Sequence, residues 1–333
     1  DIHDSILSAA PPAGENGVGR INILEEVDKH ITGNHLADEI DFINFYSKRM
    51  DRALASLEKP RPRSGTVRVT KLYSSGVVVT SKEGSLGIDL VDGPVKNDRP
   101  PEDLAGTPFS GFTLSETQRE RLAQSLDILF ITHFHHDHAG FGIARAMIRA
   151  GKKVILPGQC RTYWLESGAE WAKDCQVVKP DIIHLFNGGQ FRFWPGTQYM
   201  AWSDGNKEVP QWNHPENAEN LVFLIKMENL VFLHSGDNRD MNILPWMERV
   251  AREGWDPNLV FSPGLECVGA PLQGRLSGFR LPVHDYEFLH PRFNRIPTRW
   301  KTGAQDRMRR GRDMDLFWGE SVLFSSNGFS HDV

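Results

Sequence analysis

The sequence predicts an α/β protein, because short apolar runs typical of strands alternate with segments typical of helices. The clearest unit is the apolar run 128–131, which predicts a buried strand and is followed, after a polar turn, by a helical pattern over 139–151. A further strand is predicted at 153–157, where a second apolar run follows that helix. Upstream, alternating or apolar runs bounded by turn residues predict three more strands at 66–70, 76–80 and 85–91.

Composition narrows the range of partners. The 333 residues are 39% hydrophobic and 24% charged, and no apolar run approaches the ~20 residues that a membrane helix needs. Lys and Arg number 38 against 43 Asp and Glu, a formal charge of −5, which disfavours nucleic acid as a partner. The three cysteines lack the spacing of a metal site or a disulfide scaffold. The first residue is Asp rather than Met, which suggests either a removed signal peptide or a trimmed chain, with a slight preference for a periplasmic or secreted protein.

The chain divides into three predicted parts. Residues 1–64 form an extended arm and a helical extension, whose helical pattern ends before the prolines at 60 and 62. Residues 65–290 hold the predicted strands and every candidate site residue. Residues 291–333 mix aromatic and charged residues, and we expect them to pack on the core or against a second subunit, so a homo-oligomer stays open.

The tight turn after the 128–131 strand is the strongest functional signal. It places His133, His135, Asp137 and His138 at the carboxyl end of a strand, where α/β proteins usually bind ligands. Imidazole nitrogens and a carboxylate oxygen together suit zinc or a similar first-row metal ion. Residue type, spacing and the strand-turn-helix context therefore all predict a metal site.

The spacing H-x-H-x-D-H resembles the signature of the metallo-β-lactamase superfamily. That resemblance covers roughly residues 65–290 and implies a four-layer αβ/βα sandwich, in which two mixed sheets face each other, helices cover the outside and metals lie at the common edge of the sheets. Three downstream residues at predicted strand ends match further motifs of the superfamily in order: His214, Asp237 and His284. The superfamily also supports its metal loop with an aspartate after an early hairpin, and either Asp89 or Asp92 could fill that role.

The resemblance also implies a ligand set for two divalent metal ions, most simply zinc, with iron or manganese as alternatives. One ion would be bound by His133, His135 and His214, the other by Asp137, His138 and His284, and Asp237 would bridge both. Two such cations lower the pKa of a shared water, and the resulting hydroxide attacks the substrate. Asp137 and Asp237 are the carboxylates that we expect to take part in catalysis, Asp137 by steering a proton.

The motifs specify a site rather than a substrate. Asp237 stands where one major class of true zinc β-lactamases has a cysteine, so antibiotic hydrolysis is not the first expectation. We expect hydrolysis of a small ester, lactone, thioester or related acyl compound. The alternative is a phosphodiesterase or nuclease, suggested by the segment 235–239 and the basic run 307–312, although the acidic balance argues against it. A diiron redox protein is disfavoured by His135, because such relatives usually carry a carboxylate there.

Overall fold

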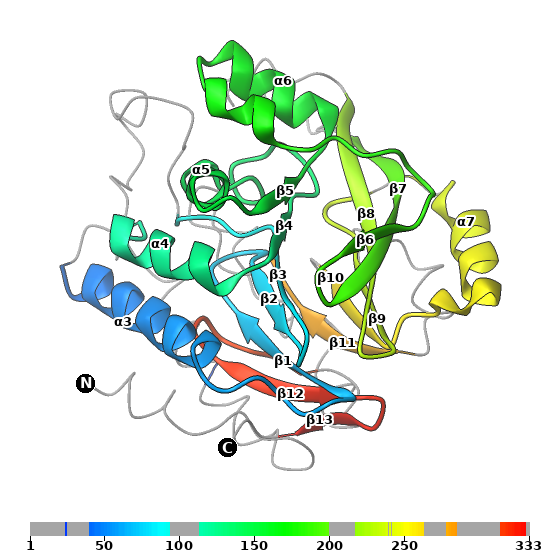
Figure 1. Ribbon diagram of the computed structural model, residues 1–333, viewed down its shortest axis with the longest axis horizontal. Coiled ribbons are helices and arrows are strands. Elements are labelled where there is room, and N and C mark those ends of the chain that lie inside the picture. Colours follow the sequence, from blue (N-terminus) through cyan, green and yellow to red (C-terminus); the bar gives the residue numbers. More distant parts are fainter. Residues whose placement is uncertain are drawn as a thin grey trace, which may run out of the picture.

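The computed structural model describes residues 24, 40–93, 113–199, 217–238, 240, 242–262, 278–284 and 314–330. Two sheets dominate these residues (Figure 1). The first has the strand order β13-β12-β1-β2-β3-β4-β5 and the second the order β11-β10-β9-β8-β7-β6. The strands of the first sheet are β1 Thr66–Lys71, β2 Val77–Thr80, β3 Ser85–Ile88, β4 Ile128–Phe130, β5 Lys153–Ile155, β12 Ser321–Ser325 and β13 Gly328–Ser330. Those of the second are β6 His184–Phe186, β7 Gly189–Tyr199, β8 Asn217–Met227, β9 Leu230–His234, β10 Leu259–Ser262 and β11 Phe279–Pro282.

Both sheets are mixed. In the first sheet β3, β4 and β5 run parallel, whereas β1, β2, β12 and β13 pair antiparallel with their neighbours. In the second sheet β9, β10 and β11 are parallel, and β6, β7 and β8 form an antiparallel meander with β9. Since the carboxyl ends of parallel strands share one edge of a sheet, the loops that follow β3, β4, β9 and β11 can meet in one place.

Three separate apolar cores show that the described chain has four layers. One lies between the first sheet and its helices, one lies between the two sheets, and the third lies between the second sheet and α7. Figure 1 shows α3, α4 and α5 on the outer side of the first sheet and α7 on the opposite side of the molecule. The helices are α3 Ile40–Leu57, α4 Glu116–Ser125, α5 Phe141–Arg149, α6 Gly158–Glu166 and α7 Ile243–Val250, with short turns at Glu170–Asp174 and Ala251–Trp255. The predicted α/β sandwich with two facing mixed sheets is confirmed.

Helix α4 begins with a capping box. The Ser115 hydroxyl accepts a hydrogen bond from the Gln118 amide, and the Gln118 side chain accepts one from the Ser115 amide. This reciprocal pair satisfies two of the amide donors that a helix start leaves without partners. The Gln118 carboxamide also donates to Asp51 on α3 at 2.9 Å, so the same cap joins two outer helices.

Strand β7 passes through Pro195 and Gly196, two residue types that are typical of turns. The structure has one continuous strand from Gly189 to Tyr199, paired with β8 along nearly its whole length. In the described residues β6 covers only the first part of its other side, so Pro195 lies where β7 is the edge of the sheet. A proline lacks the amide that a second neighbouring strand would need, and an edge position tolerates this.

The two ends of the described chain also pack on the first sheet. Strands β12 and β13 come from the part predicted to pack on the core or on a partner, and β12 pairs with β1 from Thr66↔Ser325 to Thr70↔Ser321. On one face of the same sheet, α3 packs against α4 and β1. None of the described helices is both long enough and apolar enough to cross a membrane.

Candidate metal centre

Four strand ends converge at one edge where the two sheets meet. Asp89 follows β3, and the loop 132–138 follows β4, both in the first sheet. Asp237 follows β9 and His284 follows β11, both in the second sheet. A backbone hydrogen bond from the Leu221 amide on β8 to the Thr132 carbonyl, 2.8 Å long, joins the sheets beside this edge. The site is therefore built from both halves of the sandwich.

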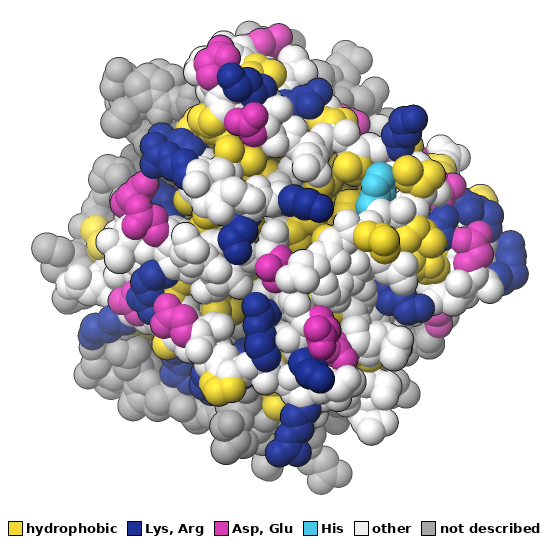
Figure 2. Space-filling model, in the orientation of Figure 1, with side chains coloured by type: hydrophobic (Ala, Val, Ile, Leu, Met, Phe, Trp, Pro, Cys, Tyr) yellow, Lys and Arg dark blue, Asp and Glu magenta, His cyan; other side chains and the backbone are white. Residues whose placement is uncertain are grey.

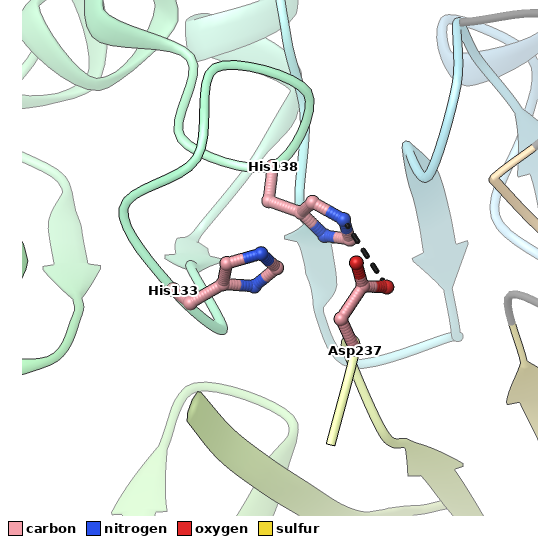
Figure 3. A group of neighbouring side chains, drawn as sticks. All are labelled: His133, His138 and Asp237. Carbon is pink, nitrogen blue, oxygen red and sulfur yellow. Dashed lines mark ion pairs between the residues drawn. The ribbon is translucent and has the colours of Figure 1, made fainter. Parts of the chain in front are cut away.

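Two groups of potential ligands overlap at His138. The ligand atoms of His133, His138 and Asp237 lie within 4.8 Å of one another, and so do those of Asp137, His138 and His284. Figure 3 shows the first group, with the His138 ring between His133 and the Asp237 carboxylate. Nε2 of His138 lies 3.6 Å from an oxygen of Asp137 and 3.6 Å from Oδ1 of Asp237. One imidazole nitrogen therefore faces both carboxylates.

The remaining predicted ligands lie close by, with one exception. Nε2 of His284 is 2.7 Å from Oδ2 of Asp137 and 3.8 Å from Oδ2 of Asp237. Nδ1 of His135 lies 3.0 Å from Nε2 of His133, so these two rings contact each other directly. The structure thus brings six of the seven predicted ligands together, whereas His214 lies outside the described residues. The grouping also differs from the expected division between two ions, because His138 belongs to both close groups.

Asp89 and Asp92, the two candidates for the supporting aspartate, have different surroundings. Asp89 is fully buried and accepts hydrogen bonds from the Thr132 amide at 2.8 Å, the Thr132 hydroxyl at 2.7 Å and Nδ1 of His138 at 2.7 Å. Asp92 is equally buried but pairs with Arg119 of α4. Of the two, Asp89 is the carboxylate that contacts the loop with the predicted ligands, and it holds His138 with Nε2 directed at Asp137 and Asp237.

Two side chains that the sequence analysis missed hold Asp237. The Asn220 carboxamide on β8 accepts a hydrogen bond from the Asp237 amide at 2.9 Å and donates one to the Ser235 carbonyl at 2.9 Å. Nε2 of Gln198 on β7 donates to Oδ2 of Asp237 at 2.9 Å. Both residues lie on strands. The residue pattern of these strands indicates only that they are buried, so no local sequence signal predicts the contact with the turn after β9.

The turn itself requires a glycine. Gly236 has a φ of +50°, and a Cβ at this position would lie 2.5 Å from Oδ1 of Asn220 and 2.6 Å from the Thr132 hydroxyl. The turn after β9 can approach the loop 132–138 of the first sheet this closely only because residue 236 has no side chain. Glycine at position 236 is therefore a steric requirement of this edge.

Burial and charge set the protonation of the histidines. Burial lowers the pKa of His133 well below its ordinary value and lowers the pKa of His135 to about 3, so both rings are neutral at pH 7. Burial also acts to lower the pKa of His138, but the nearby carboxylates, Asp137 first, outweigh it and the pKa rises. For Asp237, burial acts to raise the pKa, and the histidines His284 and His138 outweigh it and lower the pKa.

These residues fit divalent metal ions. Neutral imidazoles offer the lone pairs that metal ligation needs, and the donor set of nitrogen and carboxylate oxygen suits zinc, iron or manganese. Within the described part of the chain, Oδ1 of Asp237 is buried and accepts no hydrogen bond, and every ion pair of Asp89 and Asp237 is with a histidine. Buried carboxylates are costly unless a cation or hydrogen bonds compensate their charge. Metal ions at this edge would supply that compensation.

Solved structures with the same architecture share little sequence identity with this chain. Igni18, a novel metallo hydrolase from the hyperthermophilic archaeon Ignicoccus hospitalis KIN4/I, superimposes with a TM-score of 0.50 at 16% identity, over 78% of this chain and 99% of that one. A possible metal-dependent hydrolase from Veillonella parvula DSM 2008 gives a TM-score of 0.50 at 14% identity, over 78% and 99%. The metallo-β-lactamase fold protein YhfI from Bacillus subtilis gives 0.45 at 14% identity, over 78% and 99%.

This chain has the metallo-β-lactamase fold. The fold that the H-x-H-x-D-H resemblance implies is therefore confirmed, with the candidate ligands at the expected edge of the two sheets. No protein-family model matches the sequence, and the search of curated proteins gives no match either. At such low identities the structural similarity establishes only the fold. The chemistry of this metallo-β-lactamase-fold protein has to be argued from the residues of its site.

Proposed function

We propose that this metallo-β-lactamase-fold protein is a metal-dependent hydrolase of a small ester, lactone, thioester or related acyl compound. The observation that carries the proposal is the overlap of two ligand groups at His138, with a buried carboxylate in each group. Seven ligands are proposed. Six are the residues that converge in the structure, His133, His135, Asp137, His138, Asp237 and His284, and the seventh is His214. The named activities of Igni18 and the Veillonella parvula protein agree with this class of reaction.

Each side chain has a separate task in the proposed reaction. His133 and His135 offer neutral nitrogens for ligation because burial keeps them unprotonated. The two oxygens of Asp237 face different histidines, Oδ1 towards His138 and Oδ2 towards His284. Asp137 lies against both of those histidines and is placed to accept a proton at Oδ2. Divalent metal ions, when bound, would supply Lewis acidity and lower the pKa of a water molecule.

Zinc is the metal we propose first, with iron or manganese as alternatives. All three accept imidazole and carboxylate ligands, and the donor set alone does not separate them. A protein with two such ions needs no serine or cysteine nucleophile. In agreement with this, the two described cysteines, Cys160 and Cys175, are buried, and burial raises the pKa of both thiols.

A small neutral or weakly charged substrate fits the charge pattern better than a nucleic acid. The formal charge of the chain is −5. On the face shown in Figure 2, the described basic and acidic side chains are interspersed and form no continuous basic surface. Phosphate backbones require clustered Lys and Arg for affinity. We therefore place acyl hydrolysis ahead of phosphodiester cleavage.

Metal analysis combined with three substrates tests the proposal. The purified protein is measured for bound metal and for turnover of nitrophenyl acetate, a lactone and bis-nitrophenyl phosphate, before and after chelation. We expect about two metal ions per chain and acyl cleavage that is lost with the chelator and restored by added zinc, manganese or iron. Preference for the phosphodiester would overturn the substrate class. Absence of bound metal, with no activity on adding any of the three ions, would overturn the metal-dependent mechanism itself.

A further inference from the structure

We propose that Gln198 is a positioning residue that orients the Asp237 carboxylate for metal binding and thereby sets the affinity of the site. The proposal rests on the proposed metal-dependent function, because it concerns a ligand of that site. Gln198 lies on β7, two strands away from the β9 strand that precedes Asp237, and none of the sequence motifs includes it. Its role follows from three observations on its contacts.

The first observation is the contact itself. Nε2 of Gln198 donates to Oδ2 of Asp237 at 2.9 Å, and the Gln198 side chain is only 6% exposed. The carboxylate of Asp237 can only accept hydrogen bonds, so the amide nitrogen, not the amide oxygen, must face it. A buried hydrogen bond to a charged group is among the stronger polar contacts in a protein.

The second observation is that this is the one hydrogen bond of the Gln198 side chain in the described part of the chain. Its carboxamide oxygen is buried and has no partner among those residues. A glutamine that served only to stabilise the sheet would be expected to hydrogen-bond through both ends to neighbouring backbone or side chains. The contact of Gln198 is instead confined to a candidate metal ligand.

The third observation is that the backbone of Asp237 is held independently. Asn220 binds the Asp237 amide and the Ser235 carbonyl, each at 2.9 Å, so the turn does not depend on Gln198 for its shape. Among the described residues, the Gln198 side chain hydrogen-bonds only to the carboxylate. Its removal should leave the turn in place and free the rotation of the Asp237 side chain.

That rotation matters because the two carboxylate oxygens face different histidines. Oδ1 lies 3.6 Å from Nε2 of His138, and Oδ2 lies 3.8 Å from Nε2 of His284. The carboxylate faces both histidines only in an orientation close to this one. The amide of Gln198 fixes Oδ2 and so fixes Oδ1 as well. Residues that orient ligands in this way typically change metal affinity or activity by roughly 10- to 100-fold when they are replaced.

The test compares metal binding by the wild-type protein with metal binding by two apolar variants, Gln198→Leu and Gln198→Met. Both replacements keep most of the side-chain volume and remove the amide, and the second serves if the first does not fold. The control is Gln190→Leu, which makes the same change at the opposite end of β7, where Gln190 pairs with Lys226 of β8. Affinity for Zn²⁺ is measured by competition with a chelator, and the visible absorption bands of bound Co²⁺ report the ligand geometry.

We expect the Gln198 variants to bind at least one zinc ion roughly 10- to 100-fold more weakly than the wild type and to show shifted Co²⁺ bands. Urea unfolding of the metal-free variants should match that of Gln190→Leu, since the turn is held by Asn220. Equal affinity and equal spectra in the wild type and both Gln198 variants would overturn the role of Gln198 alone. Loss of stability in the metal-free protein with unchanged affinity would also overturn it, in favour of a structural role. A folded wild type that binds no metal would overturn the proposed function and this inference together.

Discussion

Replacing Asp89 by asparagine tests how the loop after β4 is held. Asp89 has a φ of +48°, a conformation that asparagine tolerates at least as well as aspartate, and the two side chains have the same shape. The substitution therefore changes the chemistry without changing the backbone. One carboxylate oxygen becomes an amide group that donates hydrogen bonds and cannot accept them.

The structure supplies the size of the effect. Asp89 accepts three buried hydrogen bonds, two from Thr132 and one from Nδ1 of His138, at 2.7 to 2.8 Å. An asparagine can still accept from the Thr132 amide, but the other two donors then face an NH₂ group. Hydrogen bonds to charged groups contribute about 1.5–3 kcal/mol each, so losing two of them should lower the unfolding free energy by about 3–6 kcal/mol.

Metal binding should fall for a separate reason. With Asp89 present, Nδ1 of His138 donates to that carboxylate, so Nε2, on the side of Asp137 and Asp237, is the nitrogen that a metal would bind. Opposite an amide donor, the other tautomer is favoured, with the proton on Nε2 where a metal would bind. We expect zinc affinity to fall by roughly 10- to 100-fold, as for other partners of ligating histidines.

The assays are urea unfolding of the metal-free protein and chelator competition for zinc. Asp92→Asn is the matched control, because Asp92 is equally buried but pairs with Arg119. It should lower stability while leaving zinc affinity within about 3-fold of the wild type, a difference too small for a lost ligand partner. The reasoning fails if Asp92→Asn weakens zinc binding as much as Asp89→Asn does, or if Asp89→Asn binds zinc like the wild type.

Three further predictions concern the same edge. The double variant His133→Ala, His135→Ala should abolish chelator-sensitive turnover and keep its fold by circular dichroism; full turnover would reject both ligands. Burial lowers the pKa of His234 to about 4 from an ordinary 6.5, so its neutral form stabilises the fold fully above pH 6.5. About 3 kcal/mol should be lost as the pH falls from 6.5 to 4, and urea unfolding of metal-free His234→Gln should show a smaller loss. Gly236→Ala should lose roughly 2 kcal/mol or more and bind zinc weakly, because its Cβ would collide with Asn220; wild-type stability in urea would contradict the steric argument.

The parts of the site that the sequence predicts are those encoded within a few residues. The H-x-H-x-D-H spacing lies in one turn between a strand and a helix, so its side chains come together whatever the rest of the chain does. Asp237 and His284 are predictable for a related reason, since each follows an apolar strand directly. Parallel strands then bring such ends to one edge. The ligand roles of all these residues stay predictions until metal is measured.

The parts that the sequence does not predict depend on contacts between distant strands. Gln198 and Asn220 lie in buried strands, and only the pairing of β7, β8 and β9 brings them to Asp237. The choice between Asp89 and Asp92 depends on whether Arg119, 27 residues beyond Asp92, pairs with one of them. Pro195 is a case in which local sequence suggests the wrong structure. A proline is typical of a turn, and only the strand pairing shows that Pro195 lies in a strand at an edge position.

The same contacts explain why backbone strain gathers at this edge. Among the described residues, six other than glycine have a positive φ, and three of these lie at the site: Ser74, Asp89 and His284. The His284 amide donates to the Ser74 carbonyl at 3.2 Å, so two strained residues from different sheets hold each other. Such conformations cost about 1–3 kcal/mol each and persist only where the surroundings enforce them.

A bound metal ion would add a further connection between the two sheets at this edge. Its proposed ligands would come from the first sheet through His133 and His138 and from the second through Asp237 and His284, beside the backbone bond from Leu221 to Thr132. Ligand binding to the native state alone stabilises it by about 4 kcal/mol at a concentration 1,000 times the dissociation constant. Because the ligands lie on both sheets, that stabilisation should act on the unfolding of the whole sandwich rather than on one loop. The strained conformations of Asp89 and His284 then have a physical role. Asp89 holds His138 on the first sheet, and His284 follows the second sheet, so the two conformations place both histidines within reach of a common ion.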